Sequence, residues 1–138
     1  MTASKTITEP LISLRICRPS GAFHPGETLE FEYQIDAIEP REIRAVEVSV
    51  IWFTEGKGEE DLGVHFFERS RASDVVDGDL RSLQRLACKL PPSPLTYHGT
   101  IVKIHWCVRV RLVRRSGRDI CADRLFHLLP RRVEHGSG

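Results

Sequence analysis

The stretch that decides the fold is residues 102–112, VKIHWCVRVRL. Apolar side chains occupy every second position: Val102, Ile104, Trp106, Val108, Val110 and Leu112. The positions between them hold Lys103, His105, Cys107, Arg109 and Arg111. Successive side chains of a β-strand point to opposite faces, so this alternation predicts a strand with one buried face and one polar face. A strand of this length runs the full height of a β-sandwich.

The same period of two recurs along the chain and predicts further strands. It is clear in residues 29–36 and in Val46–Trp52. Shorter strand candidates are Leu11–Cys17, Leu62–Glu68, Leu80–Leu90 and Asp119–Leu129. The leucine spacing in Leu80–Leu90 also fits a helix, but we favour a strand there. Because turn signals rich in Pro and Gly separate the candidates, we expect an all-β, antiparallel sandwich of about seven strands.

The register of the last two strands, which meet across Ser116-Gly117, stays open. A two-residue turn places His127 and Leu125 opposite Trp106 and Val108. A loop one residue longer places Leu128 and Phe126 there instead. A slip of one residue reverses the buried face, and Phe126 with Leu128 makes the better core.

Length and composition predict one cytoplasmic domain. The chain has 138 residues, and we expect a domain at 11–130 between flexible tails at 1–10 and 131–138. No apolar run approaches the ~20 residues of a transmembrane segment, and residues 1–10 lack the apolar core of a signal peptide. The cysteines show no CxxC spacing, so we expect free, mostly buried thiols rather than two disulfides. They are Cys17, Cys88, Cys107 and Cys121.

Several motifs, taken in order, resemble the arrestin-like domain family. Pro25-Gly26-Glu27 opens a predicted strand, Thr54–Gly58 follows the strand at 46–52, and the run Leu90–Gly99, LPPSPLTYHG, leads into the strand at 102–112. The resemblance covers residues 11–130 and extends to the retromer-subunit and bacterial sporulation-control members. It implies an immunoglobulin-like sandwich used as a binding scaffold. Arrestins proper carry two such domains and a phosphate-sensing polar core; this chain has room for one domain and shows no such core, so we do not transfer receptor binding or phosphate sensing.

No motif predicts catalysis, a cofactor or a metal site. The six histidines form no HxH or HExxH spacing, and GxSxG, GxGxxG and P-loop patterns are missing from the sequence. Two acidic stretches, residues 55–61 and 74–79, do not match an EF-hand. Of the two, residues 74–79 are the better candidate for calcium. We therefore expect a protein that is not an enzyme.

A basic series on and after the strand at 102–112 is the candidate partner-binding site. Its members are Lys103, His105, Arg109, Arg111, Arg114 and Arg115. Residues 1–69 contain 7 Lys/Arg and 13 Asp/Glu, whereas residues 70–138 contain 13 and 6. We favour a solvated basic face that pairs with acidic neighbours across strands. A protein partner with an acidic surface comes second, and nucleic acid is a distant third because stacking aromatic residues are missing from that face.

Two classes of function follow. The first is a non-catalytic interaction or adaptor module that acts through open sheet edges and the basic strand face. The alternative is a small-ligand-binding or hydrolytic sandwich, which requires a cleft with converging polar groups. We favour the first, with a protein partner and no nucleic acid. The sequence leaves the oligomeric state open, and a homodimer through edge strands is one option.

Overall fold

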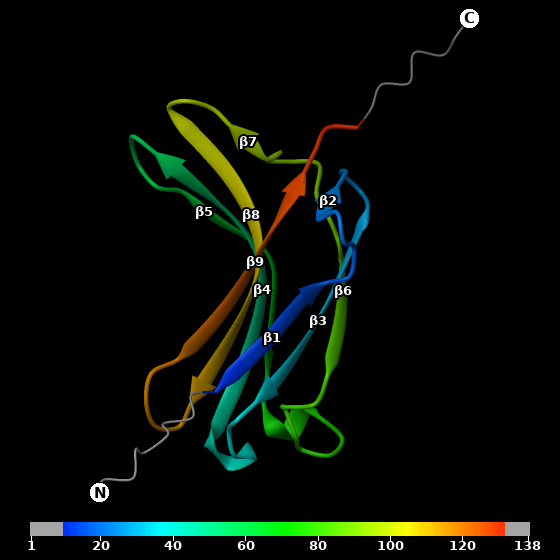
Figure 1. Cartoon of the computed structure of the whole chain (residues 1–138), viewed down its shortest axis with the longest axis vertical. Helices are drawn as coiled ribbons and strands as arrows, with labels where there is room; N and C mark the ends of the chain where they lie inside the picture. Colours follow the sequence, from blue (N-terminus) through cyan, green and yellow to red (C-terminus); the bar gives the residue numbers. More distant parts are fainter. Residues whose placement is uncertain (1–9, 132–138) are drawn as a thin grey trace, which may run out of the picture.

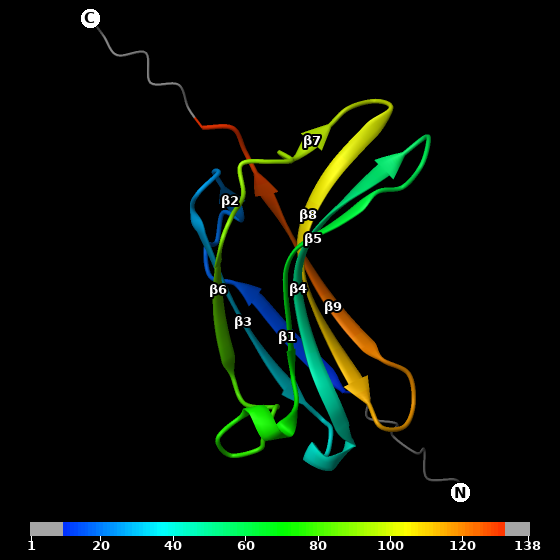
Figure 2. The ribbon, with the colours of Figure 1, turned by 180° about the vertical axis from the view of Figure 1, so that it is seen from behind.

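The computed structural model describes residues 10–131 as two β-sheets packed face to face (Figures 1 and 2). The smaller sheet has the order β1 (Leu11–Ile16), β3 (Thr28–Asp36) and β6 (Gln84–Lys89). The larger sheet has the order β2 (Ala22–Phe23), β9 (Ile120–Leu128), β8 (Val102–Arg114), β4 (Ile43–Gly56) and β5 (Leu62–Ser70). The short strand β7 (Tyr97–His98) also pairs with β8. The pairing is antiparallel except between β2 and β9.

The predicted all-β antiparallel sandwich is confirmed. The seven long strands fall where the alternation places them, although β4 extends three residues before and four residues after the predicted range. The strand predicted at Leu80–Leu90 begins only at Gln84, because residues 80–83 form a turn in which Leu80 is buried. β2 and β7, two residues each, are too short to produce a periodic signal. The predicted tails lie outside the described residues except for Pro10 and Arg131.

Within the described range, the helical segments are two 3-10 turns, Pro40–Glu42 and Ala72–Asp74. No helix there is long and apolar enough to cross a bilayer.

In the hairpin of β8 and β9, the buried face of β9 is the one that carries Phe126 and Leu128, as the sequence favoured. Phe126 is 2% exposed and Leu128 is fully buried. The pairing itself differs from both predicted registers, because Phe126, rather than Leu128 or His127, lies opposite Trp106. Relative to the longer predicted loop, β9 is shifted by two residues. A two-residue shift keeps the buried face, since the side-chain period of a strand is two.

Trp106 occupies the centre of the core, with none of its surface exposed. Its ring lies 5.7 Å from that of Phe126, and its Nε1 donates a 2.7 Å hydrogen bond to the Pro94 carbonyl oxygen. That bond satisfies a buried polar group that would otherwise be costly. Trp52, which the alternation in Val46–Trp52 places on the same face as Val46, Val48 and Val50, lies opposite Trp106 but is only half-buried. Its indole covers Gly63, where a Cβ would fall 2.0 Å from Nε1, so the close approach requires glycine.

We expect Trp106→Ala to lower the free energy of unfolding by about 3–5 kcal/mol, because it opens a large cavity in a closely packed core. Urea denaturation monitored by far-UV circular dichroism measures the change. Val76→Ala is the control: Val76 is fully exposed, and its loss should change stability by no more than about 0.5 kcal/mol. Equal effects of the two variants would contradict the central position of Trp106.

Candidate protein-interaction surface

The smaller sheet covers only one face of the larger sheet. The opposite face, which we call the outer face, carries no further layer within residues 10–131 (Figures 1 and 2). On β8, the inner-face residues Trp106, Val108 and Val110 are fully buried. The residues between them point to the outer face, as the sequence predicts. This uncovered face is therefore where the candidate basic series can meet a partner.

The six predicted site residues do not form one patch. His105, Arg109 and Arg111 share the outer face, where they lie opposite residues of β4. Arg114 and Arg115 lie at the far end of β8, about 40 Å from Lys103 at ~3.3 Å per residue. The Nε of Arg115 donates a 2.7 Å hydrogen bond to the Arg41 carbonyl oxygen. The structure thus brings together the middle of the series and separates its two ends.

The outer-face arginines are paired within the chain. Arg109 donates two hydrogen bonds to Asp123, at 2.8 and 3.1 Å. Arg111 donates two to Asp119, at 2.9 and 2.5 Å, and lies 3.9 Å from Glu47. Hydrogen bonding to these carboxylates raises the pKa of both guanidinium groups above their ordinary value. The predicted pairing of this basic face with acidic neighbours is confirmed, although both arginines stay partly exposed.

An apolar row crosses the outer face beside these charges. Val64, Ile51, Cys107 and Leu125 are direct cross-strand neighbours on β5, β4, β8 and β9. Ile51 and Cys107 are 3% and 1% exposed, although no layer within the described residues covers this face. Val64 and Leu125 are 57% and 60% exposed at the two ends of the row. We call these four residues the apolar row. The sequence did not reveal it, because each strand contributes one residue and only the register unites them.

Histidines and an aromatic ring lie next to the apolar row. Phe53 of β4 pairs with His105, and their rings are 5.1 Å apart. His105 Nε2 lies 2.7 Å from Glu55 Oε2. His98 is the third ring of a group with His105 and His127, at centroid distances of 5.8 and 6.0 Å. These histidines are far apart in the sequence, and only the pairing of β7 and β9 with β8 brings them together.

No three His, Cys, Asp or Glu side chains among the described residues are arranged to hold a metal ion. In the stretch at 74–79, the carboxylates bond to residues of their own turns. Asp74 accepts a hydrogen bond from the Arg71 backbone at 2.7 Å. Asp77 accepts one from the Asp79 backbone at 3.0 Å, and Asp79 pairs with Arg81 at 3.0 Å.

Comparison with known proteins identifies the architecture. A scan against family models finds no match, and neither does a comparison with curated protein sequences. Among solved structures, the sporulation control protein Spo0M of Bacillus subtilis superposes with a TM-score of 0.61 at 14% sequence identity. The fold is arrestin-like. The superposition covers 88% of this chain and 50% of Spo0M, so the chain spans about half the length of that protein. At this identity, the likeness concerns the arrestin-like fold alone.

The four thiols are free and differ in exposure. Cys107 is buried, Cys17 and Cys88 are half-buried, and Cys121 is exposed, so the expectation of mostly buried thiols is only partly met. Burial raises the pKa of Cys88 and of Cys107 to about 11, and for Cys107 the nearby Asp123 adds to the effect. At pH 8, a thiol with that pKa is thiolate in about one molecule per thousand.

We expect iodoacetamide at pH 8 to alkylate the exposed Cys121 first. Cys88 and Cys107 should react slowly until the chain unfolds, because the thiolate is the nucleophile and little of it forms there. Raising the pH towards 11 should accelerate their modification. Peptide mass spectrometry locates the adducts, and denatured protein without reductant should carry four. Two adducts or none would show disulfides and contradict the free thiols; fast native labelling of Cys107 would contradict its burial.

Proposed function

We propose that this chain is a non-catalytic, cytoplasmic protein-interaction or adaptor module that binds a protein partner through the outer face of its larger sheet. The observation that carries the proposal is the apolar row. Its two end residues, Val64 and Leu125, are largely exposed, and exposed apolar residues rimmed by polar groups are typical of protein-binding sites. The arrestin-like fold supports the proposal by analogy only, since a fold does not determine a function.

Leu125, at the β9 end of the apolar row, supplies exposed apolar contact, and the paired arginines beside it supply selectivity. Arg109 and Arg111 are 38% and 50% exposed in their side chains, so they remain accessible while bonded to Asp123 and Asp119. An acidic group of a partner gains the most binding free energy if it joins or replaces these carboxylates at the arginines. A neutral partner gains only weaker hydrogen bonds from the arginines, and a basic partner is repelled by them. We therefore propose a partner with an apolar centre and an acidic rim.

Leu125→Lys tests the apolar row. Affinity capture from the native cells with the wild-type domain, followed by mass spectrometry, supplies the partner for titration calorimetry. We expect the substitution to weaken binding about tenfold or more, because it places a charge in the apolar contact. Leu83→Lys is the matched control, since Leu83 is 58% exposed against 60% for Leu125 and lies before β6. Equal affinities of the two variants would exclude the apolar row, and a hydrolytic activity that persists through purification would favour the alternative function.

Charge variants test the arginines in both directions. Arg109→Glu with Arg111→Glu should slow association with an acidic partner, and the loss should shrink as salt screens the charges. Asp119→Asn with Asp123→Asn should have the opposite effect, because it releases both guanidinium groups from their intramolecular carboxylates. Stopped-flow association rates at low and high ionic strength measure both. Unchanged rates for both double variants at low salt would remove the arginines from the interface.

A further inference from the structure

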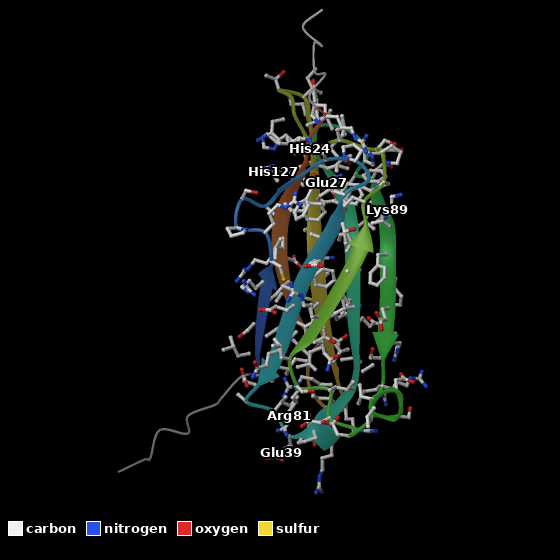
Figure 3. All side chains as sticks on the ribbon, turned by 90° about the vertical axis from the view of Figure 1, so that its right-hand side faces the viewer. His24, Glu27, Glu39, Arg81, Lys89 and His127 are labelled. Atoms are coloured by element: carbon white, nitrogen blue, oxygen red, sulfur yellow. The ribbon has the colours of Figure 1, made fainter. Side chains whose placement is uncertain are left out.

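β5 is an open edge of the larger sheet. Its one strand neighbour among the described residues is β4, and it lies along the right-hand margin of the molecule beside β6 in Figure 3. Nine residues long, β5 contains no proline and no lysine, which commonly protect edge strands against pairing. The backbone of an open edge carries unpaired N–H and C=O groups that favour the addition of a strand. β5 does contain two features that limit edge pairing, a bulge and the charged Glu68 at an inner-face position.

The bulge at His65 changes the phase of the strand. Val50 pairs with Phe66 and Ile51 with Val64, so His65 is the extra residue. Its Nε2 donates a 2.7 Å hydrogen bond to the carbonyl oxygen of Lys89, at the end of β6 in Figure 3. Because of the extra residue, the outer-face positions are even-numbered before the bulge and odd-numbered after it. These positions are Leu62, Val64, Phe67 and Arg69.

This phase change restricts the register in which β5 can pair with a second copy of itself. In two antiparallel copies related by a twofold axis at the bulge, each outer-face position before the bulge meets the equivalent position after it in the other copy. Val64 then lies opposite Phe67, and Leu62 lies opposite Arg69. Because of the extra residue, an axis that passed through one residue of the bulge would set outer-face residues opposite inner-face ones, so a symmetric pairing across the bulge is centred between His65 and Phe66. Val64 and Phe67 are 57% and 56% exposed in the single chain, so pairing covers them.

The charged residues before and after the bulge are also arranged to suit the twofold axis. The turn before β5 is acidic, with Glu59, Glu60 and Asp61. After the bulge, Glu68 takes an inner-face position opposite Val48, and the outer side carries Arg69, which bonds to Glu47 at 3.0 Å, and then Arg71. Glu60 and Arg71 lie just outside the strand, and the same register brings Glu60 of one copy to the side of the pair where Arg71 of the other lies. Opposite charges therefore meet at both ends of the pair, while apolar residues meet near its centre. Cross-strand pairs of both kinds stabilise an antiparallel sheet.

We infer that the chain forms a symmetric homodimer by antiparallel pairing of β5 with β5 of a second copy, which joins the two larger sheets into one. This interaction goes beyond the proposed partner binding and does not depend on it, since the two use different ends of the apolar row. A second copy fits this edge, because in one register the apolar residues of β5 meet apolar residues of the other copy and its acidic end meets the basic end.

Sedimentation equilibrium of the full chain tests the inference. We expect twice the chain mass at high concentration, with dissociation on dilution. Val64→Lys and Phe67→Glu should each raise the dimer dissociation constant at least about tenfold, because each places two unpaired charges in the interface. Mixing the two variants should restore dimers, since the introduced lysine of one chain then faces the introduced glutamate of the other. Far-UV circular dichroism checks that each variant folds.

Leu125→Lys is the control on the same face, and it should leave the dimer unchanged while weakening the proposed partner, so that the two proposals fail separately. A chain that stays monomeric at roughly 1 mM, where a dissociation constant of the same size would still give abundant dimers, overturns the inference. A dimer that survives Val64→Lys and Phe67→Glu overturns it as well. Dimers lost in each variant but not restored on mixing overturn the proposed register and with it the inferred interface.

Discussion

The pairing of β4 with β8 is the constraint on which the rest of the structure depends. The ladder runs from Ile43 opposite Arg114 to Gly56 opposite Val102. On its inner face, valines meet valines and form the middle of the core. Because successive side chains alternate, the same register decides which residues meet on the outer face. A slip of one residue would expose the valines and bury the arginines, and burying unpaired charges costs far more than a surface ion pair returns.

Strand positions were predictable from the sequence because alternation is a local property. Residues 102–112 contain all the information needed to place β8 and its buried face. The partner of each residue is not local, and it depends on the length and path of the connections. The hairpin to β9 shows the difference: the buried face was predicted, but the pairing of Phe126 with Trp106 was not. The apolar row and the histidine group both depend on register, so the sequence contains their residues without revealing their contacts.

Charge pairing explains why an acidic first half and a basic second half give an outer face without one dominant sign. Glu47 lies 3.9 Å from Arg111, and Glu55 lies 2.7 Å from His105, so the two halves of the sequence meet across strands β4 and β8. Arg109 and Arg111 find their closest carboxylates within the second half, on and before β9. Exposed pairs of this kind stabilise the fold by about 0–1 kcal/mol each. Their larger effect is on recognition, because an acidic partner must compete with carboxylates that are already in place.

The two proposed surfaces lie at opposite ends of the apolar row, and their relation has a consequence for binding. Val64 belongs to the open edge, whereas Leu125 lies three strands away, about 14 Å at ~4.8 Å per strand. Pairing through β5 would therefore leave Leu125 and the paired arginines accessible in both copies. Because the twofold axis is normal to the joined sheet, both partner sites would face the same side. Two equivalent sites on one surface bind a dimeric or repetitive partner more tightly than one site, because the second contact forms at the high effective concentration set by the first. Self-association would then control the strength of partner binding without altering a single residue that touches the partner.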